Sequence, residues 1–245
     1  MAKPRVLLLP GWSNGPLDYL RERFDEHVEF ISPAIHTPPL GAKCWLNPYI
    51  VVLVFVFTFC VPFIYQTIGD IFSTSSWWFL CLVEVVAFWF FCFLVKNFIV
   101  SNFVRYAIQE SVQISSLALQ KSRFDAVVGF SWGGAIAWWL LCEEVWDGPT
   151  LMLAPTIEVI RSIAGQQFPV MPIGRGKYAQ VRLFHAKNDP FCPDKQLEQL
   201  IGCGVVVYKV DDNHVLSEYS SNLKIERSFL ELLQWNSKSG EVEVD

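Results

Sequence analysis

The sequence predicts an α/β fold, with a mostly parallel sheet of about six strands, helices on both faces and an inserted helical hairpin. Short apolar runs alternate with amphipathic segments along most of the chain. Most of these runs are continuously apolar, which is typical of strands that are buried on both faces. The remaining apolar residues concentrate in residues 43–100, between the second expected strand and the next helix. The 245 residues suffice for one good-sized core, or for a small catalytic domain plus an addition.

Composition excludes some classes of function. The formal net charge is −5, so we expect no nucleic-acid partner. Hydrophobic residues make up 52% of the chain and charged residues only 18%, which is unusual for a soluble protein. The seven cysteines match no zinc-binding or CxxC spacing, and we interpret them as reduced thiols in a cytosolic compartment.

The expected elements follow one another in a regular order. The first strand covers residues 5–9 and ends at Pro10, and apolar residues at helical spacing predict the first helix over residues 16–24. The other expected elements are a strand at 27–32, a helix at 101–120, a strand at 125–130, a helix at 132–145, a strand at 150–154, a helix at 157–163, a strand at 180–185, a helix at 193–201, a strand at 205–210 and a helix at 221–234. The α/β domain would therefore combine residues 1–42 and 101–236, the insert would cover 43–100, and a disordered tail would cover 237–245.

Two long apolar runs in the insert predict a transmembrane hairpin. The first covers 17 uncharged residues from Tyr49 to Tyr65, and the second covers 19 residues from Trp77 to Val95 with Glu84 as its one charge. Each is close to the ~20 residues that span a bilayer as a helix. Aromatic residues at the ends of the runs suit the membrane interface. The alternatives are a buried pair of core helices and a dimer interface.

Basic residues predict the orientation of this hairpin. Lys43 precedes the first run, Lys96 and Arg105 follow the second, and the connector at residues 66–76 has no basic residue. The positive-inside rule then places both chain ends and the catalytic domain in the cytoplasm. We therefore expect an integral membrane protein with a cytoplasmic catalytic domain.

The motif Gly129-Phe130-Ser131-Trp132-Gly133 matches G-x-S-x-G and lies between an expected strand and an expected helix. That setting forces a sharp turn, which exposes the hydroxyl of Ser131 as a nucleophile. Gly129 and Gly133 remove side chains that would collide in the turn. The alternative is an ordinary glycine-rich turn.

A nucleophilic serine needs a base, and the base needs an acid to orient it. Asp189 and His214 follow two later strands, in the chain order serine, acid, histidine that this kind of site requires. Both lie where strands end, which is the edge at which an open α/β sheet collects its functional groups. Asp189 could instead cap a turn or helix, and His214 could be an ordinary loop residue. His185 precedes the acid, and we expect it to pack at a strand end.

Two backbone amides are the expected oxyanion hole. One belongs to Trp132, the residue after the nucleophile, and the other to Trp12 in the loop after the first strand. Gly11 would let that loop approach the site closely. A simple glycine turn is the alternative for this loop.

These residues together resemble the α/β-hydrolase superfamily over residues 4–36 and 101–235. The resemblance implies cleavage of an ester, thioester, amide or related bond through an acyl-enzyme, with no metal and no organic cofactor. Pro10 stands where many members carry a histidine, which leaves the oxyanion amide in place. Residues 155–179 leave room for a minimal cap.

The resulting hypothesis is a membrane-anchored serine hydrolase that acts on an acyl ester or thioester, such as a lipid or an acylated membrane protein. An insert that leaves from the catalytic edge of the sheet would turn the active site toward the bilayer. The alternatives are an acyltransferase with the same triad and a non-catalytic membrane adaptor that kept the fold.

Overall fold

The computed structural model describes residues 2–35, 37, 86, 89–90, 101–164 and 178–239. The chain divides into two compact units. One combines Met1–Thr37 with Ser101–Asp245 and forms the α/β domain, and the other is Pro38–Val100. The expected spans at residues 49–65 and 77–95 lie outside the described residues, apart from Val86, Trp89 and Phe90. Among the helices that the structure describes, none is both long and apolar enough to cross a membrane.

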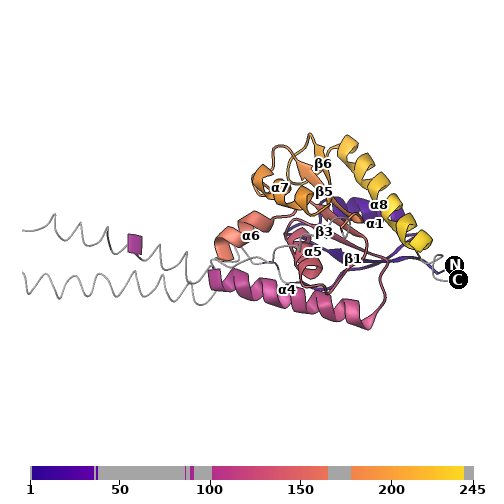
Figure 1. The fold of residues 1–245 in the computed structure, drawn as a ribbon, viewed down its shortest axis with the longest axis horizontal. Coiled ribbons are helices and arrows are strands. Elements are labelled where there is room, and N and C mark those ends of the chain that lie inside the picture. Colours follow the sequence, from indigo (N-terminus) through magenta and orange to yellow (C-terminus); the bar gives the residue numbers. More distant parts are fainter. Residues whose placement is uncertain are drawn as a thin grey trace, which may run out of the picture. The chain divides into compact units, whose positions relative to one another are not determined.

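A six-stranded sheet forms the centre of the α/β domain, in the order β2-β1-β3-β4-β5-β6 (Figure 1). All neighbouring strands are parallel. The strands are β1 (Arg5–Leu9), β2 (Glu29–Ile31), β3 (Ala126–Phe130), β4 (Thr150–Leu153), β5 (Val181–Ala186) and β6 (Val206–Val210). The expected parallel six-stranded sheet is therefore confirmed.

Helices cover both faces of this sheet, as the sequence predicts. They are α1 (Pro16–Phe24), α4 (Ser101–Lys121), α5 (Trp132–Cys142), α6 (Ile157–Ala164), α7 (Asp194–Gly202) and α8 (Tyr219–Ser239). Helix α5 packs on β1, β3 and β4 and is itself contacted by α4 and α6, whereas α1 and α8 contact each other and pack on β3 and β4 respectively. Figure 1 shows α4 and α8 on opposite sides of the sheet.

The core is built from alternating strand residues. Val6 and Leu8 of β1 pack with Leu20 of α1 and Phe229 of α8 in one buried cluster. The intervening residues are also buried, and Leu7 and Leu9 have no exposed surface. Both faces of β1 are therefore buried and apolar, which explains why this strand is a continuous apolar run in the sequence.

Three elements, β2, α5 and α8, differ from the expectation by two or more residues at an end, and the others by at most one. Strand β2 is shorter at its start because the amides of His27 and Val28 both donate to the carbonyl of Phe24, at 2.8 and 2.9 Å, and so belong to the turn after α1. Helix α5 ends three residues early because Glu144 has a left-handed backbone with φ 55°. Helix α8 extends to Ser239 and so includes the first three residues of the expected disordered tail, while residues 240–245 lie outside the described residues.

Candidate active site

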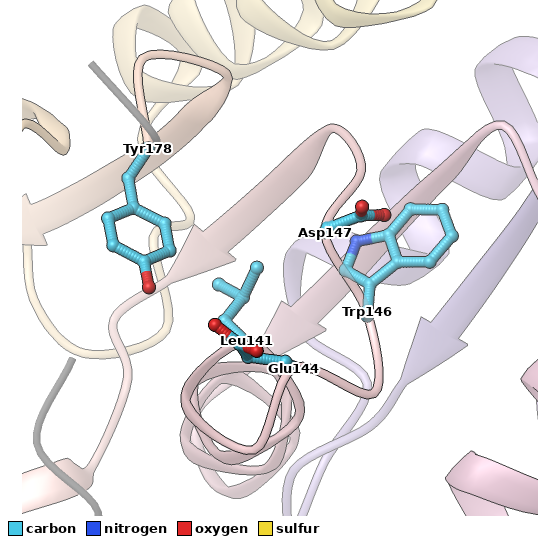
Figure 2. Close-up of a pocket in the computed structure, with 5 residues that line it drawn as sticks. All are labelled: Leu141, Glu144, Trp146, Asp147 and Tyr178. Carbon is cyan, nitrogen blue, oxygen red and sulfur yellow. The ribbon is translucent and has the colours of Figure 1, made fainter. Parts of the chain in front are cut away.

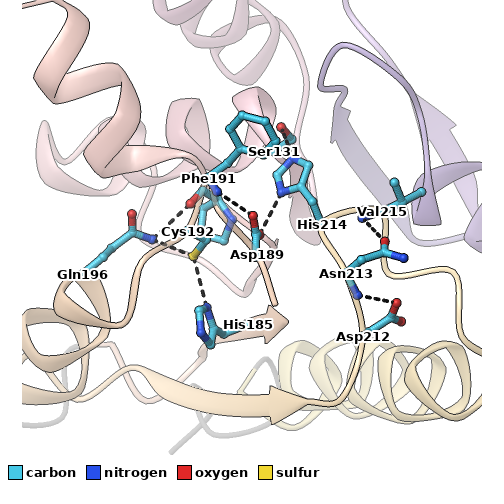
Figure 3. A network of polar contacts seen from close by, with 11 residues as sticks. Ser131, His185, Asp189, Phe191, Cys192, Gln196, Asp212, Asn213, His214 and Val215 are labelled. Atoms are coloured by element: carbon cyan, nitrogen blue, oxygen red, sulfur yellow. Dashed lines mark hydrogen bonds and ion pairs between the residues drawn. The ribbon is translucent and has the colours of Figure 1, made fainter. Parts of the chain in front are cut away.

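The carboxyl edge of the sheet brings together the three residues that the sequence predicts as a triad. Ser131 follows β3, Asp189 follows β5 and His214 follows β6. The strands are parallel, so their carboxyl ends meet at one edge. Figure 3 shows the three side chains converging from separate loops.

Ser131 stands at a sharp turn between strand and helix. Its backbone has φ 52° and ψ −112°, a conformation that residues with a side chain rarely adopt. Its amide donates to the carbonyl of Leu153 at 2.9 Å, and its own carbonyl accepts from Ala135 at 3.1 Å and from Thr156 at 3.2 Å. The turn is therefore fixed by β4 and by the first turn of α5, which explains how the strained backbone persists.

The glycines around this turn are required by close approach of the backbone. A Cβ atom on Gly129 would lie 2.4 Å from the carbonyl oxygen of Gly133, and one on Gly133 would lie 1.8 Å from the carbonyl oxygen of Leu9. Neither obstacle is a flexible side chain. The obstacle at Gly129 lies within the turn, whereas the obstacle at Gly133 is the backbone of β1.

The imidazole of His214 bridges the other two side chains. Its Nε2 atom lies 2.8 Å from Oγ of Ser131, and its Nδ1 atom lies 2.8 Å from Oδ2 of Asp189. The side chain of Asp189 is fully buried, and that of His214 is 17% exposed. In a neutral imidazole, Nδ1–H donates to the carboxylate while Nε2 accepts the hydroxyl proton of serine. The arrangement can therefore remove a proton from Ser131.

Two aromatic rings pack against the imidazole of His214. The ring of Phe191 meets His214 nearly edge-on, with centroids 5.0 Å apart, and Phe130 lies at 5.5 Å. The amide of Phe191 also donates to Oδ1 of Asp189 at 2.8 Å. Phe191 thus contacts both the base and the acid, a role that no sequence motif had indicated.

The expected oxyanion residues lie beside the serine. A Cβ atom on Gly11 would stand 2.8 Å from Cβ of Ser131, so the backbone that leads into Trp12 passes directly against the nucleophile. Trp132 is the first residue of α5, and its indole nitrogen donates to Oγ of Ser111 at 3.4 Å. Its side chain is therefore directed toward α4. The use of both amides as oxyanion donors remains a prediction.

The loop that carries His214 contains an acidic residue, Asp212, for which no sequence motif predicts a role. Asp212 is buried, with 5% of its surface exposed, and its two carboxylate oxygens accept from the amides of Asn213 and Glu218. The side chain of Asn213 accepts from the amide of Val215 at 2.9 Å. Asp and Asn commonly make such local turns, so the pair Asp212-Asn213 was the available signal.

A second polar cluster, made of His185, Cys192, Asp194 and Gln196, lies next to the loop that carries Asp189. The Sγ atom of Cys192 lies 3.4 Å from Nδ1 of His185 and accepts from Gln196 at 3.1 Å. Burial raises the pKa of Cys192 to about 12, and burial lowers the pKa of His185 even though Asp194 lies 3.0 Å from its ring. Cys192 is therefore a thiol rather than a nucleophilic thiolate. His185 packs at the end of β5, as expected.

A small surface recess lies near the opposite, amino edge of the sheet. Leu141, Trp146 and Tyr178 line it together with Glu144 and Asp147 (Figure 2). It contains none of the site residues. Within the described residues, no cluster of histidine, cysteine, aspartate and glutamate could hold a metal ion.

Comparisons with known proteins identify the fold. No family model matches the chain, and no curated protein matches its sequence. A solved structure from Xanthomonas campestris pv. campestris, described as a hydrolase of the α/β superfamily, shares 16% identity over 95% of this chain and 99% of its own, with a TM-score of 0.52. A structure from Thermoplasma acidophilum, described as a CIB-like hydrolase, shares 13% identity over 94% of this chain and 86% of its own, with a TM-score of 0.45. The first likeness shows that the chain has the α/β-hydrolase fold, as its sequence predicts.

Proposed function

We propose that this protein is a serine hydrolase that cleaves an acyl ester or thioester through an acyl-enzyme. The observation that carries the proposal is the bridge made by His214, with 2.8 Å contacts to both Ser131 and Asp189. The strained backbone of Ser131 supports it, since such strain is typical of functional positions.

Each side chain has a defined step in this scheme. His214 takes the hydroxyl proton while Oγ of Ser131 attacks the acyl carbonyl, and Nε2–H then gives that proton to the leaving alcohol or thiol. Water, deprotonated by the same imidazole, attacks the acyl-enzyme and releases the acid and the free serine. Asp189 holds the ring in place and stabilises the imidazolium that forms in both steps.

The proposed oxyanion hole uses the amides of Trp12 and Trp132. Such donors typically lower the barrier by about 3–4 kcal/mol each, because they stabilise charge that develops only in the transition state. The close approach of Gly11 to Ser131 supports this assignment.

Exposed apolar residues in the loops of the site favour a lipid-like acyl group. Trp12, Phe191 and Val215 each belong to a loop of the site, and 45%, 39% and 46% of their respective surfaces are exposed. Large apolar residues exposed at a polar site favour an apolar ligand, because its binding removes their surface from water.

We also propose that residues 49–65 and 77–95 anchor the protein in a membrane, with the α/β domain on the cytoplasmic side. The sequence arguments are the length of both apolar runs and the placement of the basic residues. In the second run, Val86, Trp89 and Phe90 are helical and each is at least 59% exposed. Apolar helical residues with that much exposed surface suit a lipid environment.

The test of the chemistry uses the purified full-length chain in detergent and a series of p-nitrophenyl esters and acyl thioesters of increasing chain length. We expect hydrolysis that favours the longer acyl groups and that Ser131→Ala abolishes. Hydrolysis retained by Ser131→Ala would contradict the proposal. Product analysis with added alcohol separates free acid, expected here, from the transferred acyl group of an acyltransferase.

The test of the anchor is extraction of native membranes with alkaline carbonate, followed by protease treatment of sealed vesicles. We expect the chain to stay in the membrane pellet, and its α/β domain to be digested only from the cytoplasmic side. Release by carbonate without detergent would contradict a transmembrane hairpin.

A further inference from the structure

We propose that Asp212 is a positioning residue, which holds the loop of His214 so that the imidazole keeps its contacts with Ser131 and Asp189. This inference rests on the proposed function, because it assigns a role in the same site. The carboxylate of Asp212 binds two backbone amides, and we infer that it acts on the triad through the backbone.

The carboxylate of Asp212 spans the whole loop. Its Oδ1 atom accepts from the amide of Asn213 at 2.7 Å, one residue before His214. Its Oδ2 atom accepts from the amide of Glu218 at 3.0 Å, just before α8 begins at Tyr219. One buried side chain thus binds both ends of the segment that carries His214. Figure 3 shows the contact between Asp212 and Asn213.

The backbone of Asp212 also contacts the loop of the acid. Its carbonyl accepts from the amide of Asn188 at 3.4 Å, and Asn188 directly precedes Asp189. Just before these two residues in the chain, the amide of Lys187 donates to the carbonyl of Val210 at 3.0 Å. The two loops are therefore joined at their bases, and Asp212 belongs to that junction.

The loop needs such support because it contains a strained residue. Leu216 has a left-handed backbone with φ 53° and is fully buried, and its amide donates to the carbonyl of Asn213 at 3.1 Å. A leucine in that conformation persists only where its surroundings hold it. The Asp212 carboxylate accepts one charge-assisted hydrogen bond before Leu216, from Asn213, and one after it, from Glu218.

Asparagine cannot replace this carboxylate. The two amides need two acceptor oxygens, and an asparagine side chain offers one oxygen and one NH2 donor. In Asp212→Asn, one of the two amides would face another donor, and the loop would have to shift. Asp211 is the matched control, since it is the neighbouring aspartate and is exposed to solvent.

The first readout is hydrolysis by the full-length chain. We expect Asp212→Asn to lower kcat about 10- to 100-fold with little change in KM, since small displacements of a catalytic group have effects of that size. Asp211→Asn should retain the wild-type rate. In a His214→Ala background, Asp212→Asn should cause no further loss, because it acts through His214. An equal loss in that background would overturn the proposal and indicate a purely structural role.

The second readout is the NMR signal of the His214 Nδ1 proton, which reports the contact with Asp189 directly. We expect it to weaken or move in Asp212→Asn and to be unchanged in Asp211→Asn. An identical signal in all three proteins would overturn the proposal. This contrast can be measured whether or not the chain turns over substrate. A wild-type chain without hydrolase activity would contradict the proposed function instead.

The wild-type chain provides the test if Asp212→Asn does not fold. The amides of Asn213 and Glu218 should exchange with solvent slowly, as amides bound to a buried carboxylate do. Exchange of both at the rate of an unstructured loop would overturn the proposal.

Discussion

The first turn of α5 contacts the end of β1 so closely that a Cβ atom on Gly133 would lie 1.8 Å from the carbonyl oxygen of Leu9. The backbone of the helix that follows Ser131 therefore packs directly against the backbone that leads to Trp12. This contact brings the nucleophile and the proposed oxyanion loop together.

Replacing Gly133 should destabilise the fold. We expect Gly133→Ala to lower the free energy of unfolding by about 1–3 kcal/mol or more, because the obstacle is backbone and cannot rotate away. Gly202→Ala is the matched control, since a Cβ atom there meets nothing within 4 Å. Chemical denaturation of both variants measures the difference. Equal midpoints for the two variants would show that α5 does not approach β1 as described.

Replacing the acid should affect turnover and leave substrate binding nearly unchanged. We expect Asp189→Asn to reduce kcat about 10,000-fold with KM nearly constant, because the imidazole loses the carboxylate that holds its tautomer. The exposed Asp18→Asn is the control. Steady-state kinetics with a p-nitrophenyl ester provide the measurement. A loss smaller than tenfold would remove Asp189 from the proposed triad.

His185 should make stability depend on pH. Burial lowers its pKa below the ordinary value of 6.5, although Asp194 and Asp189 oppose the shift. The unfolded chain therefore binds the proton more readily. The contribution of His185 to stability is fully present above about pH 6.5 and is lost as the pH falls from there to the folded pKa.

Thermal unfolding at several pH values measures this effect. We expect the Tm of His185→Gln to depend less on pH below about pH 6.5 than the Tm of the wild type. His27→Gln is the control, because His27 is exposed. Parallel curves for the wild type and His185→Gln would contradict the lowered pKa.

Much of the fold could be predicted from the sequence because its four inner strands, β1, β3, β4 and β5, are buried on both faces. Runs such as Arg5–Leu9 contain no alternation, and this is what a parallel sheet between two helical layers requires. The triad positions could be predicted for a related reason. Ser131 directly follows β3, Asp189 and His214 lie in the loops that follow β5 and β6, and parallel strands bring those positions to one edge.

Other features depend on contacts that no short sequence pattern contains. The early end of α5 follows from the left-handed backbone of Glu144. The late start of β2 follows from the hydrogen bonds that two amides, of His27 and Val28, donate to the carbonyl of Phe24. The contacts of Phe191 with both His214 and Asp189 arise from tertiary packing. Asp212 reads as an ordinary polar loop residue until its two amide partners, one and six residues away, are known.

The most direct test of the account is labelling of the folded full-length chain with a fluorophosphonate, which forms a covalent bond with an activated serine. We expect one label per chain, on the peptide that contains Ser131. Labelling should be absent in Ser131→Ala and unchanged in Ser220→Ala, which alters an exposed serine. A folded wild-type chain that takes no label, or a Ser131→Ala variant that is still labelled, would contradict the assignment of Ser131 as the nucleophile.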